Sequence, residues 1–149
     1  MKVKEIMSHP VITVRENDSL ETAARLMLDK KIGCVPVVDE QGKTRGIVTE
    51  SNFTAKSKGI PFSTFRAPQL LGHWLSGAGV ERIYNAARKT PVKEIMTAPV
   101  VSVGEGDSVN KVVELMLKHD INRVPVLRDG IPIGIVARHD LLRLLAPQE

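Results

Sequence analysis

The sequence predicts an α+β fold in which two β-α-β-β-α repeats pack sheet to sheet around a pseudo-twofold axis. Three observations predict it: an internal duplication, alternating strand and helix patterns within each copy, and the small size of one copy. A single copy has an apolar sheet face and apolar helix stripes but too few residues to cover both. We therefore expect residues 1–149 to form one domain.

The duplication is directly visible in the sequence. Residues 3–38 align without a gap to residues 92–127, and 18 of the 36 aligned pairs are identical, whereas average composition gives about one identical pair in twenty. One deletion follows in the second copy, and the match then continues through the next strand. The first repeat therefore spans residues 3–53 and the second spans residues 92–145.

Three strands are predicted in each copy. A β-branched run opens the copy, and a second apolar run carries a central proline, which cannot donate to a ladder and so indicates a sheet edge or a bulge. A glycine-containing turn then leads into the third strand as a hairpin. The predicted strands cover residues 11–14, 34–38 and 45–49 in the first copy, and 100–103, 123–127 and 131–137 in the second.

A helix is predicted between the first and second strands of each copy. Apolar residues recur at i, i+3, i+4 and i+7 from Leu20 and again from Val109, which is the pattern of a half-buried helix. Asp18 and Asp107 stand where an N-cap carboxylate would accept a backbone N–H, and Glu21 completes a capping-box spacing in the first copy.

The remaining segments are a last helix in each copy and an insert between the copies. The last helices are predicted to begin near Glu50 and Arg138. Residues 54–91 have no counterpart elsewhere in the chain, and their prolines and glycines divide them into pieces. We expect helices at Gln69–Ser76 and Val80–Lys89 in this insert.

Composition narrows the class of protein. The 149 residues are 42% hydrophobic, contain no apolar run long enough to span a membrane, and begin without a signal-peptide pattern. We therefore expect a soluble cytoplasmic protein with no membrane partner. The lone cysteine, Cys34, predicts a small core residue rather than a disulfide or a metal ligand, and no metal-ligand spacing occurs. A net charge of +4 permits an anionic partner.

Several motifs together carry a family resemblance. Each copy has the opening Val-Lys-Glu-Ile-Met, a Val-Pro-Val strand, and a Gly-Ile-Val junction that is followed, after three intervening residues, by Asn52 or Asp140. These closely resemble a tandem of cystathionine-β-synthase (CBS) domains, called a Bateman module. The resemblance implies a non-catalytic regulatory module that requires no cofactor. It also implies a cleft between the copies for an adenosine-containing ligand, such as AMP, ADP, ATP or S-adenosylmethionine.

The resemblance also implies which residues contact that ligand. Asp140 matches the carboxylate that binds both ribose hydroxyls, a charge-assisted interaction, and the first copy has Asn52 in its place. Thr49 matches a hydroxyl that reaches phosphate, and Arg123 matches a phosphate-binding base. The expected ligand-binding residues are Thr13, Val35, Ile47, Thr49, Asn52, Ser102, Arg123, His139 and Asp140.

The two expected sites are unequal. The first copy lacks the carboxylate, and the second has Ala137 where a hydroxyl is usual. Across the pseudo-twofold axis, Arg123 and His139 are expected to face the site headed by Thr49 and Asn52. That site would then have the better phosphate lining, and the Asp140 site the better ribose anchor.

Alternative interpretations stay open at this stage. Asp140 also fits a first-turn helix acid and Thr49 a plain N-cap. The aromatic residues of the insert, within 61–84, fit either an edge cap or an interface to a protein partner, and a homodimer is expected. The alternative function is a protein-interaction or dimerisation module in which the ligand cleft is vestigial. A third class, a basic nucleic-acid-associated regulator, requires Lys and Arg on one face and is disfavoured by the 3% aromatic content.

Overall fold

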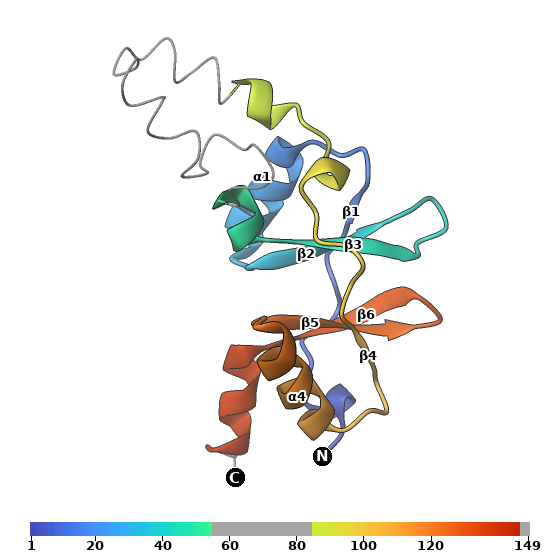
Figure 1. The fold of residues 1–149 in the computed structure, drawn as a ribbon, viewed down its shortest axis with the longest axis vertical. Helices are drawn as coiled ribbons and strands as arrows, with labels where there is room; N and C mark the ends of the chain where they lie inside the picture. Colours follow the sequence, from blue (N-terminus) through green and yellow to red (C-terminus); the bar gives the residue numbers. More distant parts are fainter. Residues whose placement is uncertain (55–84, 147–149) are drawn as a thin grey trace.

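The computed structural model describes residues 1–54 and 85–146, which form two half-molecules whose sheets face each other (Figure 1). Each sheet has three strands, in the order β1-β2-β3 or β4-β5-β6, with the first pair parallel and the second antiparallel. The strands are β1 (Val14–Arg15), β2 (Cys34–Val38), β3 (Thr44–Thr49), β4 (Val103–Gly104), β5 (Arg123–Arg128) and β6 (Ile131–Ala137). The predicted α+β class and sheet-to-sheet packing are confirmed.

One long helix covers the outer face of each sheet (Figure 1). Helix α1 is Leu20–Lys30 and helix α4 is Val109–His119. Their buried residues recur at the predicted helical spacing: Leu20, Ala23 and Met27 in α1, and Val109, Val112 and Met116 in α4. Burying this stripe against the sheet supplies most of the stability of an amphipathic helix.

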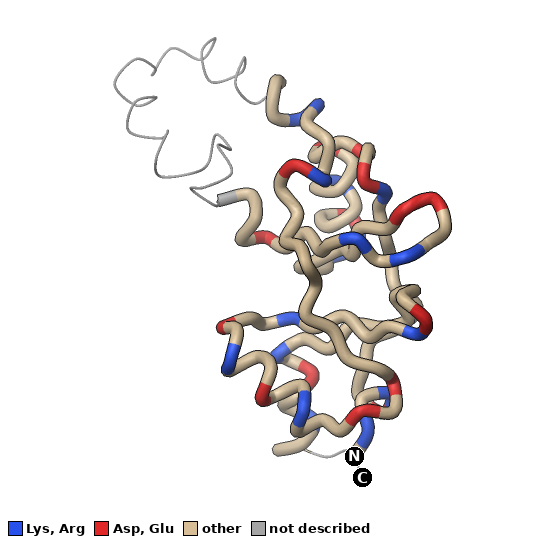
Figure 2. Tube along the Cα trace, turned by 45° about the vertical axis from the view of Figure 1, so that its right-hand side comes forward, with Lys and Arg blue, Asp and Glu red and all other residues tan. Residues whose placement is uncertain are grey.

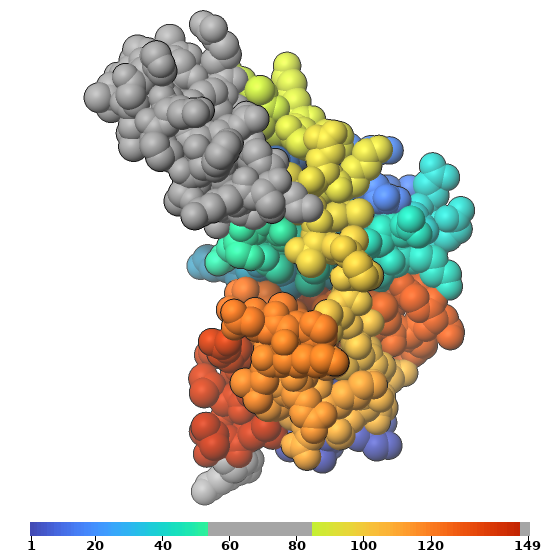
Figure 3. All heavy atoms as spheres, viewed as in Figure 1, coloured from blue at the N-terminus to red at the C-terminus, as the bar shows by residue number. Residues whose placement is uncertain are grey.

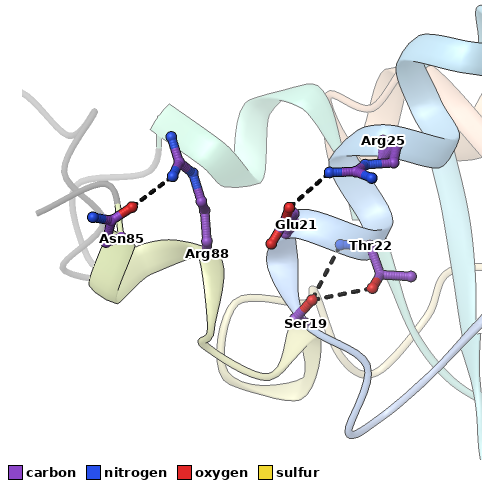
Figure 4. Close-up of polar contacts among 6 residues, drawn as sticks. All are labelled: Ser19, Glu21, Thr22, Arg25, Asn85 and Arg88. Carbon is purple, nitrogen blue, oxygen red and sulfur yellow. Dashed lines mark hydrogen bonds and ion pairs between the residues drawn. The ribbon is translucent and has the colours of Figure 1, made fainter. Parts of the chain in front are cut away.

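The predicted N-caps are wrong by one residue. Ser19 caps α1, because its Oγ accepts from the Thr22 N–H at 3.1 Å (Figure 4), and Ser108 caps α4 in the same way. The carboxylate of Asp18 instead accepts from the Arg15 N–H and closes the turn after β1. Asp107 does the same after β4. A carboxylate one position before the cap therefore stabilises the approach to the helix rather than its first turn.

The capping box predicted from Glu21 is also absent, because with Ser19 as N-cap the third helical residue is Thr22. The Glu21 carboxylate instead forms an ion pair at 2.7 Å with Arg25, one helical turn later (Figure 4). In the same view, Arg88 donates to the Asn85 side chain beside the start of α1.

The ends of each repeat differ from the prediction in detail. The opening strands are only two residues long, and the last helices are 3-10 helices, η2 (Glu50–Thr54) and η5 (Arg138–Leu144). Residues 85–88, within the predicted helix Val80–Lys89, are helical. The other predicted insert helix, Gln69–Ser76, lies outside the described residues.

A proline lies in the central strand of each sheet. The sequence predicted instead that this proline marks a sheet edge or a bulge. Pro36 pairs with Ile47 of β3, but the N–H and C=O of Ile47 both bond to Thr97 on the far side of β3. The Pro36 position therefore needs no donor toward β3. The register shift of the strand pair follows one residue later. Pro125 in β5 repeats the arrangement.

Each repeat lends its first residues to the core of the other. Val92 and Ile95, which open the second repeat, are buried in the hydrophobic cluster of the first half. Val3 and Ile6, which open the first repeat, are buried in the cluster of the second half. Figure 3 shows the yellow segment that contains residues 92–96 crossing the green and cyan atoms of the first half. This exchange links the two halves, because the opening residues of each repeat are buried in the hydrophobic cluster of the other half.

The tips of the two hairpins also touch. The Thr44 N–H donates to the Gly130 carbonyl at 2.8 Å, and the Lys43 ammonium donates to the Asp129 carbonyl. These contacts close one end of the space between the sheets. No helix among the described residues has the length and apolar character needed to cross a membrane.

Candidate functional site

Two cavities lie in the cleft between the halves. Cavity 1 has a volume of about 300 Å³ and is lined by Ser8, Pro10, Val11, Ile12, Lys31, Ile32, Gly33, Cys34, Arg123, Ile135, Ala137, His139 and Asp140. Cavity 2 has a volume of about 350 Å³ and is lined by Ile47, Thr49, Glu50, Ser51, Thr97, Pro99, Val101, Asp120, Ile121, Asn122, Arg123 and Pro125. Both volumes lie at the lower end of the range for small-molecule sites.

The two cavities are built in the same way from opposite repeats. One wall comes from the opening segment of a repeat and the end of its long helix, and the other wall comes from the third strand and last helix of the other repeat. Lys31 in cavity 1 and Asp120 in cavity 2 are equivalent in the duplication, and both adopt positive φ angles, 54° and 51°. The duplication therefore produces two related sites with a common backbone plan.

The charged residues of the two cavities are reversed. Cavity 1 contains the cations Lys31 and Arg123 together with His139, against one carboxylate, Asp140. Cavity 2 contains the carboxylates Glu50 and Asp120 against Arg123, which lines both cavities. An anionic group is therefore favoured in cavity 1 and opposed by the rim of cavity 2.

Asp140 is the buried carboxylate of cavity 1, with 5% of the residue exposed. It lies in the first turn of η5, where its Oδ2 accepts from the Ala137 N–H at 2.8 Å. Its Oδ1 is 4.0 Å from the Arg143 guanidinium and accepts no hydrogen bond within the described part of the chain. That oxygen can accept from ligand hydroxyls, so the capping and binding interpretations of Asp140 are compatible.

Asn52, the equivalent residue, is committed to the protein. Its Oδ1 accepts from the Thr49 N–H at 2.7 Å, and its Nδ2 donates to the Thr97 hydroxyl at 3.1 Å. The side chain is buried and is not one of the described residues that line cavity 2. Thr49 does line cavity 2, but its hydroxyl pairs with Ser51 at 2.7 Å.

Arg123 lines both cavities, and its guanidinium lies against Gly33 of cavity 1. It starts β5, and its guanidinium lies directly on Gly33, where an added Cβ would be 2.1 Å from Nη2 and 2.4 Å from Cζ. Its repeat equivalent, Cys34, lies beside it near the pseudo-twofold axis. Burial raises the pKa of the Cys34 thiol to about 11, partly offset by the Arg123 charge. The buried thiol confirms the prediction of a core residue.

The remaining expected residues are distributed as follows. Ile47 lines cavity 2, and Val35 is fully buried in the core of the first half. Thr13 and Ser102 are half-buried and are absent from the described lining of either cavity.

His139 lies with Asp140 in cavity 1, rather than across the axis with Thr49 and Asn52 as the sequence suggested. Ala137, at the end of β6, and His139 and Asp140, in the first turn of η5, all line this cavity. The better phosphate lining and the better ribose acceptor are consequently in the same cavity.

Sequence reasoning missed Lys31, Gly33 and Asp120. A usable signal was present in the duplication, because the aligned pairs 31/120 and 33/122 follow the long helix and differ in charge or size. No group of three or more His, Cys, Asp or Glu side chains suited to a metal ion occurs among residues 1–54 and 85–146.

Both the sequence and the fold are similar to those of known proteins. The uncharacterized protein MJ1404 of Methanocaldococcus jannaschii is 34% identical over 145 residues, covering 97% of this chain, and the chain spans 32% of that protein's length. The crystal structure of the CBS domain of a CBS domain containing membrane protein from Sphaerobacter thermophilus is 42% identical, with a TM-score of 0.77 and coverage of 97% of this chain and 87% of that one.

A second solved structure is informative about ligands. It is the CBS domain pair of protein MJ0100 in complex with 5-methylthioadenosine and S-adenosyl-L-methionine, 29% identical, with a TM-score of 0.72 and coverage of 100% of this chain and 98% of that one. The family model of the CBS domain matches this chain twice, over residues 3–58 and 92–147. The chain therefore belongs to the CBS domain family and carries two copies of the domain in tandem.

Proposed function

We propose that this chain is a non-catalytic regulatory module that binds an adenosine-containing ligand in the cleft between its two repeats. Binding at the junction of the halves would shift their relative packing, and a partner would read that shift. The ligand class is AMP, ADP, ATP or S-adenosylmethionine, and no cofactor is required.

The observation that carries the proposal is the composition of cavity 1. Apolar side chains of Val11 and Ile12 offer a surface for the adenine faces, and the buried Asp140 carboxylate offers an acceptor for ribose hydroxyls. Lys31 and Arg123 offer cations for phosphate. The three chemical parts of an adenosine nucleotide thus each have a matching group in one cavity. The similar MJ0100 domain pair, which binds two adenosine compounds, supports this assignment.

The non-catalytic part of the proposal rests on the nucleophiles of the cleft. Cavity 1 contains the Cys34 thiol, the Ser8 hydroxyl and the His139 ring. In the described part of the chain no hydrogen bond joins that ring to either nucleophile, and the pKa of Cys34, raised to about 11, keeps the thiol protonated near neutral pH.

The interaction-module alternative is favoured by one observation on the outer faces. Leu28 of α1 and Leu117 of α4 are equivalent in the duplication, and each is 78% exposed. Because both leucines present apolar surface at the same point of the two long helices, we include homodimerisation and a protein partner in the proposal. The insert residues 61–84 lie outside the described residues. Light scattering at tens of micromolar should show a dimer, and a purely monomeric parent would contradict it.

The nucleic-acid alternative receives less support. Figure 2 shows Lys and Arg interspersed with Asp and Glu over both halves of the described chain, rather than gathered on one face. The electrostatic footprint of a nucleic-acid site requires such a gathered patch.

Isothermal calorimetry on Asp140 variants tests the proposal. We expect Asp140→Ala to weaken AMP and adenosine about 10- to 150-fold, because a charged hydrogen bond contributes about 1.5–3 kcal/mol. Asp140→Asn should recover part of this loss by keeping the shape and one acceptor. Asp29→Ala, an exposed acid on α1, is the matched control and should leave affinity unchanged.

Two outcomes would overturn the proposed function. One is a parent chain that binds no adenosine compound at millimolar concentration. The other is an Asp140→Ala variant that retains the parent's affinity. The first result would favour the interaction module with a vestigial cleft, and the second would overturn the assignment of cavity 1 as the binding site.

A further inference from the structure

We propose that Gly33 is a specificity-determining residue, because its missing side chain seats the Arg123 guanidinium in cavity 1 and so directs phosphate-bearing ligands there. Cavity 2, whose described lining sets the carboxylates of Glu50 and Asp120 against the shared Arg123, then accepts adenosine compounds that carry no phosphate. This inference rests on the proposed function and assigns a ligand charge to each of its two cavities.

The path of the Arg123 side chain is the first step. Its backbone pairs with Ala137, which lines cavity 1, and its chain neighbours Asn122 and Pro125 line cavity 2. Its guanidinium, however, rests on Gly33, which lines cavity 1. Arg123, a residue of the second repeat, therefore places its charge against Gly33 of the first repeat, in the lining of cavity 1.

The second step is the space at position 33 that admits the Arg123 guanidinium. A Cβ at position 33 would lie 2.1 Å from Nη2, 2.4 Å from Cζ and 2.8 Å from Nε of Arg123, so any side chain there must displace the guanidinium. Gly33 does not have a positive φ, so an alanine is compatible with its backbone. The glycine is thus required by the arginine rather than by the turn. In the second repeat the equivalent position is Asn122.

The third step is the difference in charge between the two cavities that share Arg123. In cavity 1 it joins Lys31 and His139 near the buried Asp140, which makes a phosphate-binding group adjacent to a ribose acceptor. In cavity 2, Arg123 is the one cation among the described lining residues, against the carboxylates of Glu50 and Asp120. Carboxylates repel phosphate and attract a cationic group such as a sulfonium, so the two cavities select opposite ligand charges.

A substitution that moves the guanidinium without unfolding the chain tests the proposal. Gly33→Ala requires only a flexible side chain to swing away, and Gly106→Ala, at a glycine with nothing within 4 Å of an added Cβ, is the matched control. Calorimetry of the full chain with AMP and with 5-methylthioadenosine gives the ratio of phosphate-bearing to phosphate-free affinity. We expect Gly33→Ala to lower the AMP affinity at least tenfold and to change that of methylthioadenosine less than threefold.

Two further measurements isolate the role of Arg123. Arg123→Ala should reproduce the AMP loss, and adding Gly33→Ala to it should cost no more, since the glycine acts through the arginine. Amide NMR titration with pyrophosphate alone should perturb residues 31–34 and 139–140 in the parent, with little change at 120–122. The cavity 1 response should be lost in Gly33→Ala.

The outcomes separate this proposal from the proposed function. Binding of adenosine compounds with an unchanged AMP-to-methylthioadenosine ratio in Gly33→Ala would overturn the role of Gly33 and leave the function intact. A pyrophosphate response at cavity 1 that depends on Gly33, without binding of any adenosine compound, would support the seat and overturn the function. No response to any of these probes, or a pyrophosphate response centred on cavity 2, would overturn the proposal.

Discussion

The two halves of the molecule share their cores and differ in the residues that line the cleft. The pairs Val3/Val92 and Ile6/Ile95 are buried in both halves, whereas the cleft pairs Lys31/Asp120 and Cys34/Arg123 differ in charge. A core position is held by packing against many neighbours, and a cleft position meets mainly ligand or solvent. The duplicated fold can therefore give its two cavities separate ligand preferences at little cost in stability.

The largest expected effect tests whether the two cores contribute equally to the stability of the chain. Ile95→Ala and Ile6→Ala each remove a side chain that is at most 2% exposed, so each should lower the free energy of unfolding by about 2–5 kcal/mol. Because each isoleucine lies in the other repeat's half, denaturant unfolding should stay a single transition in both variants. Leu145→Ala, at a residue that is 83% exposed, is the control. Two separated transitions would contradict the single-domain proposal.

The second prediction uses the pair that differs most, Cys34 and Arg123. The Cys34 pKa is raised from 9.0 to about 11 in the folded chain, first by burial. Between these values the unfolded chain loses its thiol proton and the folded chain keeps it, so stability falls as pH rises from about 9 to 11. The loss is on the order of 2 kcal/mol.

Denaturant titrations of the parent and Cys34→Ala across pH 8–11 isolate this contribution from other groups. The difference in stability between the two proteins should be constant below pH 9 and should then shift against the parent. In Arg123→Ala, the pKa of the thiol should rise further, because the guanidinium charge lowers it. A parent and Cys34→Ala with parallel pH profiles would disprove the buried-thiol contribution.

A third comparison sets Asn52 against Asp140. Asn52→Ala should cost about 1–3 kcal/mol of stability, because it leaves the Thr49 N–H and the Thr97 hydroxyl without their buried partner. The AMP affinity should stay within about twofold, since the better-lined site is cavity 1. Thermal unfolding checks the predicted loss of stability, and calorimetry checks the predicted AMP affinity. An AMP loss as large as that of Asp140→Ala would show that Asn52 is the ribose contact instead.

The smallest expected effect concerns the left-handed residues at the ends of the long helices. Lys31 and Asp120 have φ angles of 54° and 51°, a conformation that costs a non-glycine residue about 1 kcal/mol. Lys31→Gly and Asp120→Gly should therefore both stabilise the chain slightly. Only Lys31→Gly should weaken AMP, severalfold, because only Lys31 supplies a cation to cavity 1. Equal effects of both variants on AMP would remove the charge distinction between the cavities.

Sequence alone determined the duplication, the order of elements and the buried faces of the long helices, because periodicity follows from local geometry. The Leu20 and Val109 stripes are buried as expected, and β6 has the predicted bounds Ile131–Ala137. The N-cap predictions failed because serine and aspartate are adjacent before both helices, and both residue types are good N-caps. Only the turn geometry decides which one bonds to the helix, here Ser19 and Ser108.

The cleft required the tertiary structure. Which residues share a cavity depends on how two distant segments pack, so His139 lies with Asp140 and Asn52 is used by Thr49 and Thr97. The exchange of opening segments between the cores was equally invisible, because Val3 and Val92 occupy equivalent places in the repeat and fit either core. The seat of Arg123 on Gly33 joins residues ninety positions apart. Such a contact exists only because the halves meet across the axis, which no local pattern encodes.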